Sequence, residues 1–413
     1  MREFVKLKIN FISKSLSQLI HPPVSSLRPI DGIRAVATLS VVLFHVVWYA
    51  GFYIPAQQFS DFLNHQLLIL ISQGHFGMDA FFVISGFLIA RLLIKEHQES
   101  GAIDLKRFYF RRMLRIFPVF FTVLFIYVSF FHPRCPNLWA NILQVNNFLP
   151  MKDQCMGWTW SLAIECQFYL FAPFIISLFT RAKKIRFVLF AGTMAFLVLI
   201  SAYVVLHYRL YLNYSLHPVF NQKGFELFYD VFHDKTYTRV GPIVWGVMAA
   251  FLYQDTPRFR QWITSKPVLW GSLVFTAWCF WYSVFSIRVT NLEAVPNLSK
   301  IVFFISGRFV FSLGLTLLML LMMTASAKAS KIIGDFFSQP FWYPFAQLSY
   351  SVFLIHPIVI LTCYNNRFLE APASVFILLI QALFFILASF LLAIPLHVLI
   401  EKPFMDIRDK WKT

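Results

Sequence analysis

An arginine and a histidine stand eleven positions apart in one apolar segment, residues 33–53, which is long enough to cross a membrane. Eleven residues of α-helix rise by about 16 Å and return almost to the starting azimuth, so Arg34 and His45 are expected on one face of a helix. Ionisable side chains inside a membrane are costly and are functional by default. The spacing therefore predicts one polar track through the bilayer, with Arg34 at its edge and His45 near its middle.

Three further polar side chains are expected at depths close to that of His45. Asp79 and Ser85 share a second apolar segment, and Glu165 lies in another. With both segments running inward, helix rise places all three side chains in the outer half of the bilayer. We therefore predict that they meet His45 as catalytic residues, because acidic and basic groups gathered together favour proton transfer. Each residue taken alone also has a structural alternative. His45 could be a hydrogen-bonded histidine packed between helices, and Asp79 and Glu165 could each belong to a structural ion pair.

Four arginines lie in the connection before the third apolar segment: Arg107, Arg111, Arg112 and Arg115. Arg112 and Arg115 share a helix face at i, i+3, and guanidinium groups bind phosphate through paired hydrogen bonds. This spacing predicts a phosphate site at the inner membrane surface, to which Arg34 would contribute. The alternative is that these charges only anchor the chain at the membrane interface.

The composition predicts the elements that must position these residues. With 58% hydrophobic, 19% aromatic and 13% charged residues, the chain has too little polar surface for a soluble domain. It is expected to be an all-α polytopic membrane protein. Windows of about 20 apolar residues predict ten spans, at 33–53, 74–94, 114–132, 158–180, 186–206, 239–253, 268–287, 301–325, 341–365 and 373–400.

The distribution of basic residues predicts the orientation. A cytoplasmic N-terminus places most of the 36 Lys and Arg residues on the inner side, as the positive-inside rule requires, so both termini are expected in the cytoplasm. No apolar core precedes the first span, and no cleavable signal peptide is expected. The net charge of +17 is explained by this topology and by anionic lipid headgroups. Without a folded soluble domain, nucleic-acid binding is not expected.

We expect three parts of the chain: a basic cytoplasmic segment (1–27), a ten-helix membrane domain (28–404) and a cytoplasmic tail (405–413). Cys135 and Cys155 flank one outer loop, where a disulfide is possible in an oxidising compartment; this pairing stays open. None of the five cysteines has metal-ligand spacing, and no metal is expected. The aromatic and acidic loop 207–238 could bind sugar or cap the bundle.

Six motifs in consistent order resemble the membrane acyltransferase-3 family of bacterial integral-membrane O-acyltransferases. Any one of them is weak, but the six together are specific. The sequence departs from the family's usual residues at three positions, Met78, Ala80 and Cys166, and these departures are mild. The matching stretches are Arg28–Ala35 with His45 following, Gly77–Phe87, Arg111–Pro118, Trp160–Glu165 with Gln167–Tyr169, Leu348–Ser351 leading to His356 and Pro357, and Glu401–Phe404.

The resemblance implies ten helices in a bacterial inner membrane, an acyl-CoA donor that is usually acetyl-CoA, and a hydroxyl acceptor on an envelope saccharide such as lipopolysaccharide O-antigen. It also implies that Arg34, Arg112, Arg115 and Asp31 bind the donor. Many members of the family carry an extra outer hydrolase-like domain. Because the chain stops at Thr413, a stand-alone form without that domain is expected.

The mechanism expected from these residues is direct acyl transfer with His45 as general base, because imidazole titrates near neutrality. Glu165 or Asp79 would orient His45 or bind the sugar, and Ser85 would donate to the developing oxyanion. A covalent acyl-His45 or acyl-Ser85 intermediate stays open. Two other functions also stay open: a non-enzymatic transporter of lipid or small molecules, and an acyltransferase acting on a small cytosolic acceptor.

Overall fold

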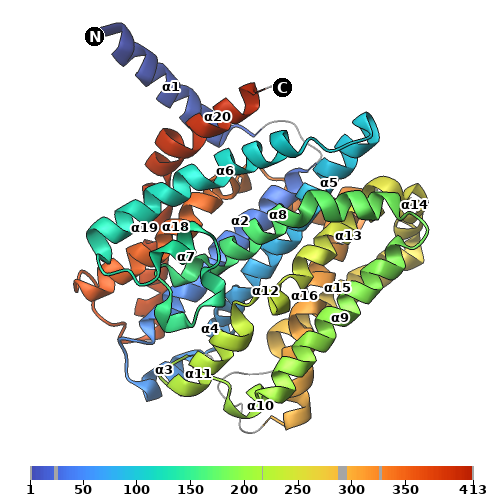
Figure 1. The fold of residues 1–413 in the computed structure, drawn as a ribbon. Helices are drawn as coiled ribbons and strands as arrows, with labels where there is room; N and C mark the ends of the chain where they lie inside the picture. The colour runs from blue at the N-terminus through green and yellow to red at the C-terminus, as the bar shows by residue number, and fades with distance from the viewer. Residues whose placement is uncertain (1, 23–26, 216, 287–294, 325–327, 412–413) are drawn as a thin grey trace.

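The computed structural model describes residues 2–22, 27–215, 217–286, 295–324 and 328–411, and every regular element in this part of the chain is helical (Figure 1). Nine helices or helical runs among these residues are long and apolar enough to cross a membrane. The predicted all-α, multi-pass membrane fold is confirmed. The nine comprise α2 (Arg28–Ala50), α4 with α5 (Gln66–Ser72 and Phe76–Ser100), α6 (Leu105–Ile126), α8 (Trp160–Arg181), α9 (Arg186–His207), α15 (Lys266–Phe285), α16 (Asn297–Thr324), α18 (Trp342–Asn365) and α19 with α20 (Val375–Leu396 and Lys402–Lys410).

The remaining α-helices connect these spans or extend from the bundle. Helices α1 and α20, at the two ends of the chain, lie at one end of the bundle, and α3, α10 and α11 lie at the other (Figure 1). The side of the membrane to which each end belongs stays a prediction from charge. These helices are α1 (Arg2–Ile20), α3 (Ala56–Leu63), α7 (Leu138–Ile142), α10 (Leu210–Asn213), α11 (Gln222–Phe228), α12 (Thr236–Arg239), α13 (Gly241–Asp255), α14 (Pro257–Ile263) and α17 (Lys328–Phe337).

The sixth predicted span differs from the expectation. Residues 239–253 were predicted to cross the membrane as one full-length helix, whereas α13 has only 15 residues, which is about 22 Å of helix against a hydrocarbon thickness of about 30 Å, so α13 by itself covers only part of that thickness. Its apolar side chains Ile243, Val247 and Phe251 are almost fully buried. The hydropathy of this segment therefore reflects burial inside the protein, where it packs against α5 and α16.

Two glycines explain how closely α13 and α5 approach. A Cβ atom on Gly86 would overlap the carbonyl oxygen of Ile243, and a Cβ atom on Gly246 would overlap the carbonyl oxygen of Val83. The two backbones therefore touch directly, as small residues permit in membrane helix packing. Gly86 immediately follows Ser85, so this contact also fixes the position of a predicted site residue.

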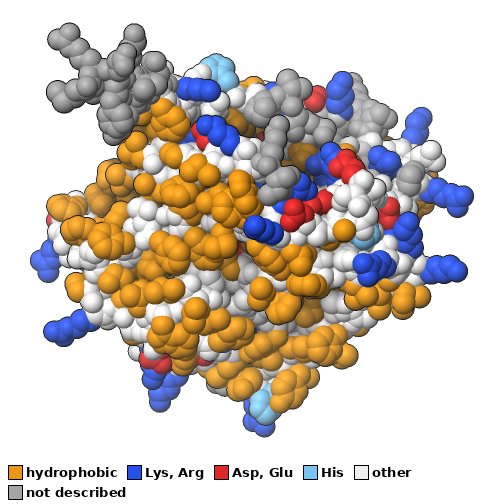
Figure 2. All heavy atoms as spheres, turned by 45° about the horizontal axis from the view of Figure 1, so that its top comes forward, with side chains coloured by type: hydrophobic (Ala, Val, Ile, Leu, Met, Phe, Trp, Pro, Cys, Tyr) orange, Lys and Arg blue, Asp and Glu red, His pale blue; other side chains and the backbone are white. Residues whose placement is uncertain are grey.

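The flank of the bundle is apolar, as a lipid-facing surface requires. Phe125 on α6, Val188 on α9 and Phe376 on α19 are each at least 69% exposed. Figure 2 shows hydrophobic side chains spread over this flank, with Lys, Arg, Asp and Glu side chains gathered toward the end that carries α20. Such a surface would be insoluble in water, so it supports placement in a bilayer.

The cysteine pair left open by the sequence forms a disulfide. Cys135 and Cys155 are bonded to each other, and 20 positions separate them in the chain. The bridge closes the loop that connects the end of α6 to α8. This loop carries Met151, Gln154 and Gly157, which line the larger cavity described below.

Candidate active site

Six of the eight predicted site residues line two cavities instead of one continuous track, and Asp79 and Asp31 line neither cavity. Helix α2 contributes His45 to a cavity of about 580 Å³ and Arg34 to a second cavity of about 170 Å³. Ser85 on α5 and Glu165 on α8 line the smaller cavity with Arg34. The expectation that Ser85 and Glu165 meet His45 is therefore wrong, because helix rise predicts depth along a helix but not which cavity a side chain enters.

His45 instead contacts a second histidine, on α18. Nε2 of His356 lies 3.1 Å from Nδ1 of His45. Each Nδ1 atom also lies 2.9 Å from the carbonyl oxygen four residues earlier in its own helix, Val41 for His45 and Val352 for His356. His356 is fully buried, so α18 holds it in place behind His45.

These contacts assign the ring protons of the two neutral imidazoles. A carbonyl oxygen only accepts, so Nδ1 of His356 carries the proton that faces Val352, and its Nε2 carries a lone pair. The atom that faces this lone pair, Nδ1 of His45, must then be the donor, which also suits its contact with Val41. Nε2 of His45 is left without a proton. A ring in this tautomer can accept a proton from a substrate in the larger cavity.

A three-residue hydrogen-bond network occupies the smaller cavity. The Ser85 hydroxyl donates to Oε1 of Glu165 over 2.6 Å, and the Tyr169 hydroxyl donates to the same oxygen. The two hydroxyl oxygens lie 2.9 Å apart. Glu165 is thus held by its own cavity and makes no hydrogen bond to His45, so the structure does not support the prediction that Glu165 orients His45.

The three predicted phosphate-binding arginines all line the smaller cavity, but they differ in their partners. Arg115 forms a 2.6 Å ion pair with Glu401, which is 1% exposed, so Glu401 already balances its charge. Arg34 is 3.6 Å from Asp31. Arg112 has no ion pair within the described residues and lies 5.9 Å from the ring centroid of Tyr169. Arg112 and Arg34 are therefore better placed than Arg115 to hold an anion.

Asp79 was expected to meet His45, but it forms an ion pair with Arg239. Its Oδ1 lies 3.4 Å from Nη1 of Arg239, and both side chains are at most 1% exposed. Neither cavity is lined by Asp79. The alternative of a structural ion pair, which the sequence left open, describes Asp79 better than an orienting or sugar-binding role.

An aromatic contact joins the linings of the two cavities. Phe82 lines the smaller cavity and Trp160 lines the larger one, and their ring centroids are 6.1 Å apart in an edge-to-face arrangement. The guanidinium carbon of Arg239 lies 4.6 Å from the Trp160 ring centroid. The Arg239 and Asp79 pair therefore lies beside the place where the two linings touch.

The larger cavity has predominantly aromatic walls. The loop 207–238, for which sugar binding and capping were the alternatives, contributes aromatic side chains to this wall. Indole, phenol and phenyl faces present the apolar surface on which sugar rings stack, while scattered polar groups fix orientation. The contributing residues are Tyr214, Phe225, Phe228, Tyr229 and Phe232.

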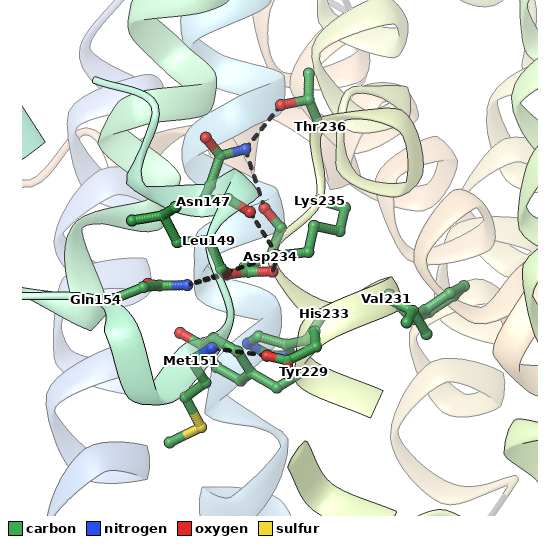
Figure 3. A network of polar contacts seen from close by, with 12 residues as sticks. Asn147, Leu149, Met151, Gln154, Tyr229, Val231, His233, Asp234, Lys235 and Thr236 are labelled. Atoms are coloured by element: carbon green, nitrogen blue, oxygen red, sulfur yellow. Dashed lines mark hydrogen bonds and ion pairs between the residues drawn. The ribbon is translucent and has the colours of Figure 1, made fainter. Parts of the chain in front are cut away.

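A polar network joins this loop to the disulfide-closed loop (Figure 3). Asp234 pairs with Lys235 at 3.0 Å and accepts a hydrogen bond from Gln154 over 2.8 Å. Lys235 donates to the carbonyl oxygen of Asn147 over 2.7 Å, and the Asn147 amide donates to Thr236 over 2.9 Å. Burial raises the pKa of Asp234 to about 7. The network fixes two loops as one wall, which keeps Gln154 at the edge of the larger cavity.

Four residues of these two sites were missed as site residues. His356 stood in a recognised motif, but only the tertiary structure brings α18 beside α2. Tyr169 also lies in a motif. Arg239 and Arg308 could have been recognised as candidates because each is an arginine within or next to an apolar segment. Arg308 on α16 lines the larger cavity.

Comparisons with known proteins agree with the motifs. A family model described as "Acyltransferase domain" matches residues 28–398. A Staphylococcus aureus (strain COL) protein named "Putative O-acetyltransferase" is 26% identical over 388 residues, which cover 85% of this chain and 53% of that protein. The O-acetyltransferase OatA of Staphylococcus aureus (strain NCTC 8325 / PS 47) is 24% identical over 373 residues, covering 86% of this chain and 54% of its own length.

The chain thus spans about half the length of the curated relatives it matches. No solved structure matches it. The resemblance drawn from six short motifs is confirmed by a match over most of the chain. We conclude that this chain belongs to the acyltransferase-3 family.

Proposed function

We propose that this chain is a membrane O-acyltransferase that moves an acetyl or other short acyl group from acyl-CoA to a hydroxyl of a saccharide. It would act in the plasma membrane of a bacterium, with the donor entering from the cytoplasm. The observation that carries the proposal is the 3.1 Å contact between Nε2 of His356 and Nδ1 of His45, because it leaves Nε2 of His45 available as a base. His45 lines an aromatic cavity and shares its helix with Arg34, which lines the neighbouring cavity.

The smaller cavity fits the donor. Arg34 and Arg112 would hold the CoA phosphates, since guanidinium groups suit phosphate oxygens. The pantetheine arm would then follow α2 toward His45, over a helix rise of about 16 Å that is comparable with the arm's length. On this path the arm would pass the contact between Phe82 and Trp160, whose rings belong to the two cavity linings.

The larger cavity would hold the acceptor sugar against its aromatic wall. As the acceptor oxygen attacks the thioester carbonyl, its proton passes to Nε2 of His45, and a tetrahedral intermediate forms. Collapse of this intermediate breaks the carbon–sulfur bond, and the departing CoA thiolate takes the proton from the imidazolium. His356 would act as a positioning residue, because its Nε2 lone pair holds the Nδ1 proton of His45 and stabilises the imidazolium.

Ser85 is less suited to be the oxyanion donor than the sequence suggested. Its hydroxyl already donates to Glu165, and both line the donor cavity. We assign Ser85, Glu165 and Tyr169 to binding the part of the pantetheine arm that lies next to the CoA phosphates. This assignment does not require Glu165 to contact His45.

The test uses purified full-length protein in proteoliposomes, with acetyl-CoA and a saccharide acceptor, and measures release of free CoA thiol. His45→Ala should reduce acceptor-dependent thiol release by at least about 100-fold, as expected for loss of a general base. His207→Ala, at the exposed end of α9, is the matched control and should keep the wild-type rate.

Full thiol release by His45→Ala would refute the role of His45. Acceptor uptake into vesicles without acetyl-CoA, together with no thiol release by the wild type, would refute acyl transfer and favour transport. Mass spectrometry of envelope glycans from cells with and without the chain would then identify the acetylated hydroxyl.

A further inference from the structure

Arg308 is the one formally charged side chain that lines the larger cavity in the part of the chain that the structure describes. The lining includes His45, His75 and His233 but no Asp or Glu. Among the described residues, the guanidinium nitrogens of Arg308 have hydrogen-bond contacts with His233 alone, whose carbonyl oxygen and Nδ1 are each 3.5 Å away. The guanidinium carbon also lies 5.5 Å from the ring centroid of Phe232.

The carboxylates around this cavity are already engaged elsewhere. Asp230 accepts a hydrogen bond from the backbone N–H of Met151 over 2.7 Å, and Asp234 pairs with Lys235 in the network of Figure 3. Asp79 pairs with Arg239. Among the described residues, none of these three carboxylates forms an ion pair with Arg308.

A guanidinium in aromatic surroundings is poorly solvated, and an anion stabilises it more than neutral groups do. His233 offers a carbonyl oxygen and one ring nitrogen at the limit of hydrogen-bond distance, which leaves most of the five N–H donors of Arg308 available. The cavity therefore combines aromatic walls, a base and an available fork of donors. These are the elements needed to bind a sugar ring that carries a negative charge.

We propose that the acceptor is an anionic saccharide, whose carboxylate or phosphate group binds Arg308 while its hydroxyl faces His45. This inference rests on the proposed function, because it assigns the larger cavity to the acceptor. It adds the chemical class of the acceptor. Arg308 holds the charged group and takes no part in proton transfer, so it acts on acceptor binding and not on donor binding.

The first experiment measures binding without any acyl donor. Trp48, Trp158 and Trp160 line the cavity, so quenching of tryptophan fluorescence reports its occupation. Methyl galacturonide and galactose 1-phosphate are compared with neutral methyl galactoside, on wild-type protein and on Arg308→Gln. A charge-assisted hydrogen bond should make the charged sugars bind about 10- to 100-fold more tightly to the wild type, and Arg308→Gln should abolish that difference.

The two charged probes separate a uronate carboxylate from a sugar phosphate as the recognised group. Arg308→Lys keeps the charge but loses the fork, so it should retain part of the preference, and it also covers the case in which Arg308→Gln fails to fold. If neither charged sugar binds more tightly than the neutral one, or if Arg308→Gln weakens all three equally, the inference is overturned.

A second experiment separates this inference from the proposed function. In the thiol-release assay, Arg308→Gln should raise the KM for the charged acceptor about 10- to 100-fold and leave the KM for acetyl-CoA within about twofold. A raised KM for acetyl-CoA would instead assign Arg308 to the donor and overturn the inference. Charge-selective binding without thiol release by the wild type would refute acyl transfer while the inference about the cavity stands.

Discussion

The contact between His356 and His45 makes a prediction that is independent of the family. His356→Leu removes the Nε2 lone pair that lies 3.1 Å from Nδ1 of His45. His45 would keep its hydrogen bond to the carbonyl oxygen of Val41, so the ring stays in place. What it loses is one of two acceptors for the Nδ1 proton.

The magnitude follows from the charge that develops on His45 during transfer. A hydrogen bond to a charged group contributes about 1.5–3 kcal/mol, and each 1.36 kcal/mol changes the rate tenfold. His356→Leu should therefore lower kcat by about 10- to 150-fold. The KM for acetyl-CoA should not change, because Arg34 and Arg112 line the other cavity.

The assay is acceptor-dependent thiol release in proteoliposomes, with initial rates measured over a range of acetyl-CoA concentrations. His356→Gln offers an amide oxygen as a replacement acceptor and should recover part of kcat, which a merely structural role would not explain. His207→Leu, an exposed site on α9, controls for the loss of a histidine. Wild-type kcat in His356→Leu, or a change confined to KM, would refute the reasoning about the ring protons.

Two further predictions concern stability. Asp79→Ala leaves Arg239 buried without its partner and should lower the free energy of unfolding by about 3–5 kcal/mol, seen as a lower Tm in detergent; an unchanged Tm would contradict the pair. Burial lowers the pKa of His217 to about 4, below its unfolded value of 6.5. Its contribution of about 3 kcal/mol to the free energy of unfolding is therefore present above pH 6.5 and is lost as the pH falls toward 4. His217→Gln should flatten this part of the stability curve, and an unchanged slope would exclude His217 as its cause.

Much of the fold could be predicted because hydropathy is local. Each of the ten predicted spans overlaps a helix, including the short α13. Helix α13 shows the limit of the method: a segment surrounded by protein and a segment surrounded by lipid are equally apolar, so hydropathy predicts neither the short length of α13 nor its burial. Gly86 and Gly246, which let α13 approach α5, report on packing only after the two helices are known to be neighbours.

The candidate site was predictable in its parts but not in its grouping. Helix geometry alone places Arg34 and His45 at different depths, and the structure puts them in two cavities on the same helix. Ser85 and Glu165 meet each other, as their compatible depths allowed, but they do so in the cavity of Arg34. Asp79 meets Arg239, a partner about 160 positions away that no spacing rule indicates.

The sequence by itself determined that this is an all-α membrane protein of the acyltransferase-3 family, because apolar length and short motifs are properties of contiguous residues. Only the tertiary structure decided that His356 faces His45, that Arg34 and His45 line two different cavities, and that Arg308 lines the larger one. The physical reason is that these relations depend on how each helix is rotated and which helix is its neighbour. In a membrane those choices are made by close packing and buried polar pairs between distant residues.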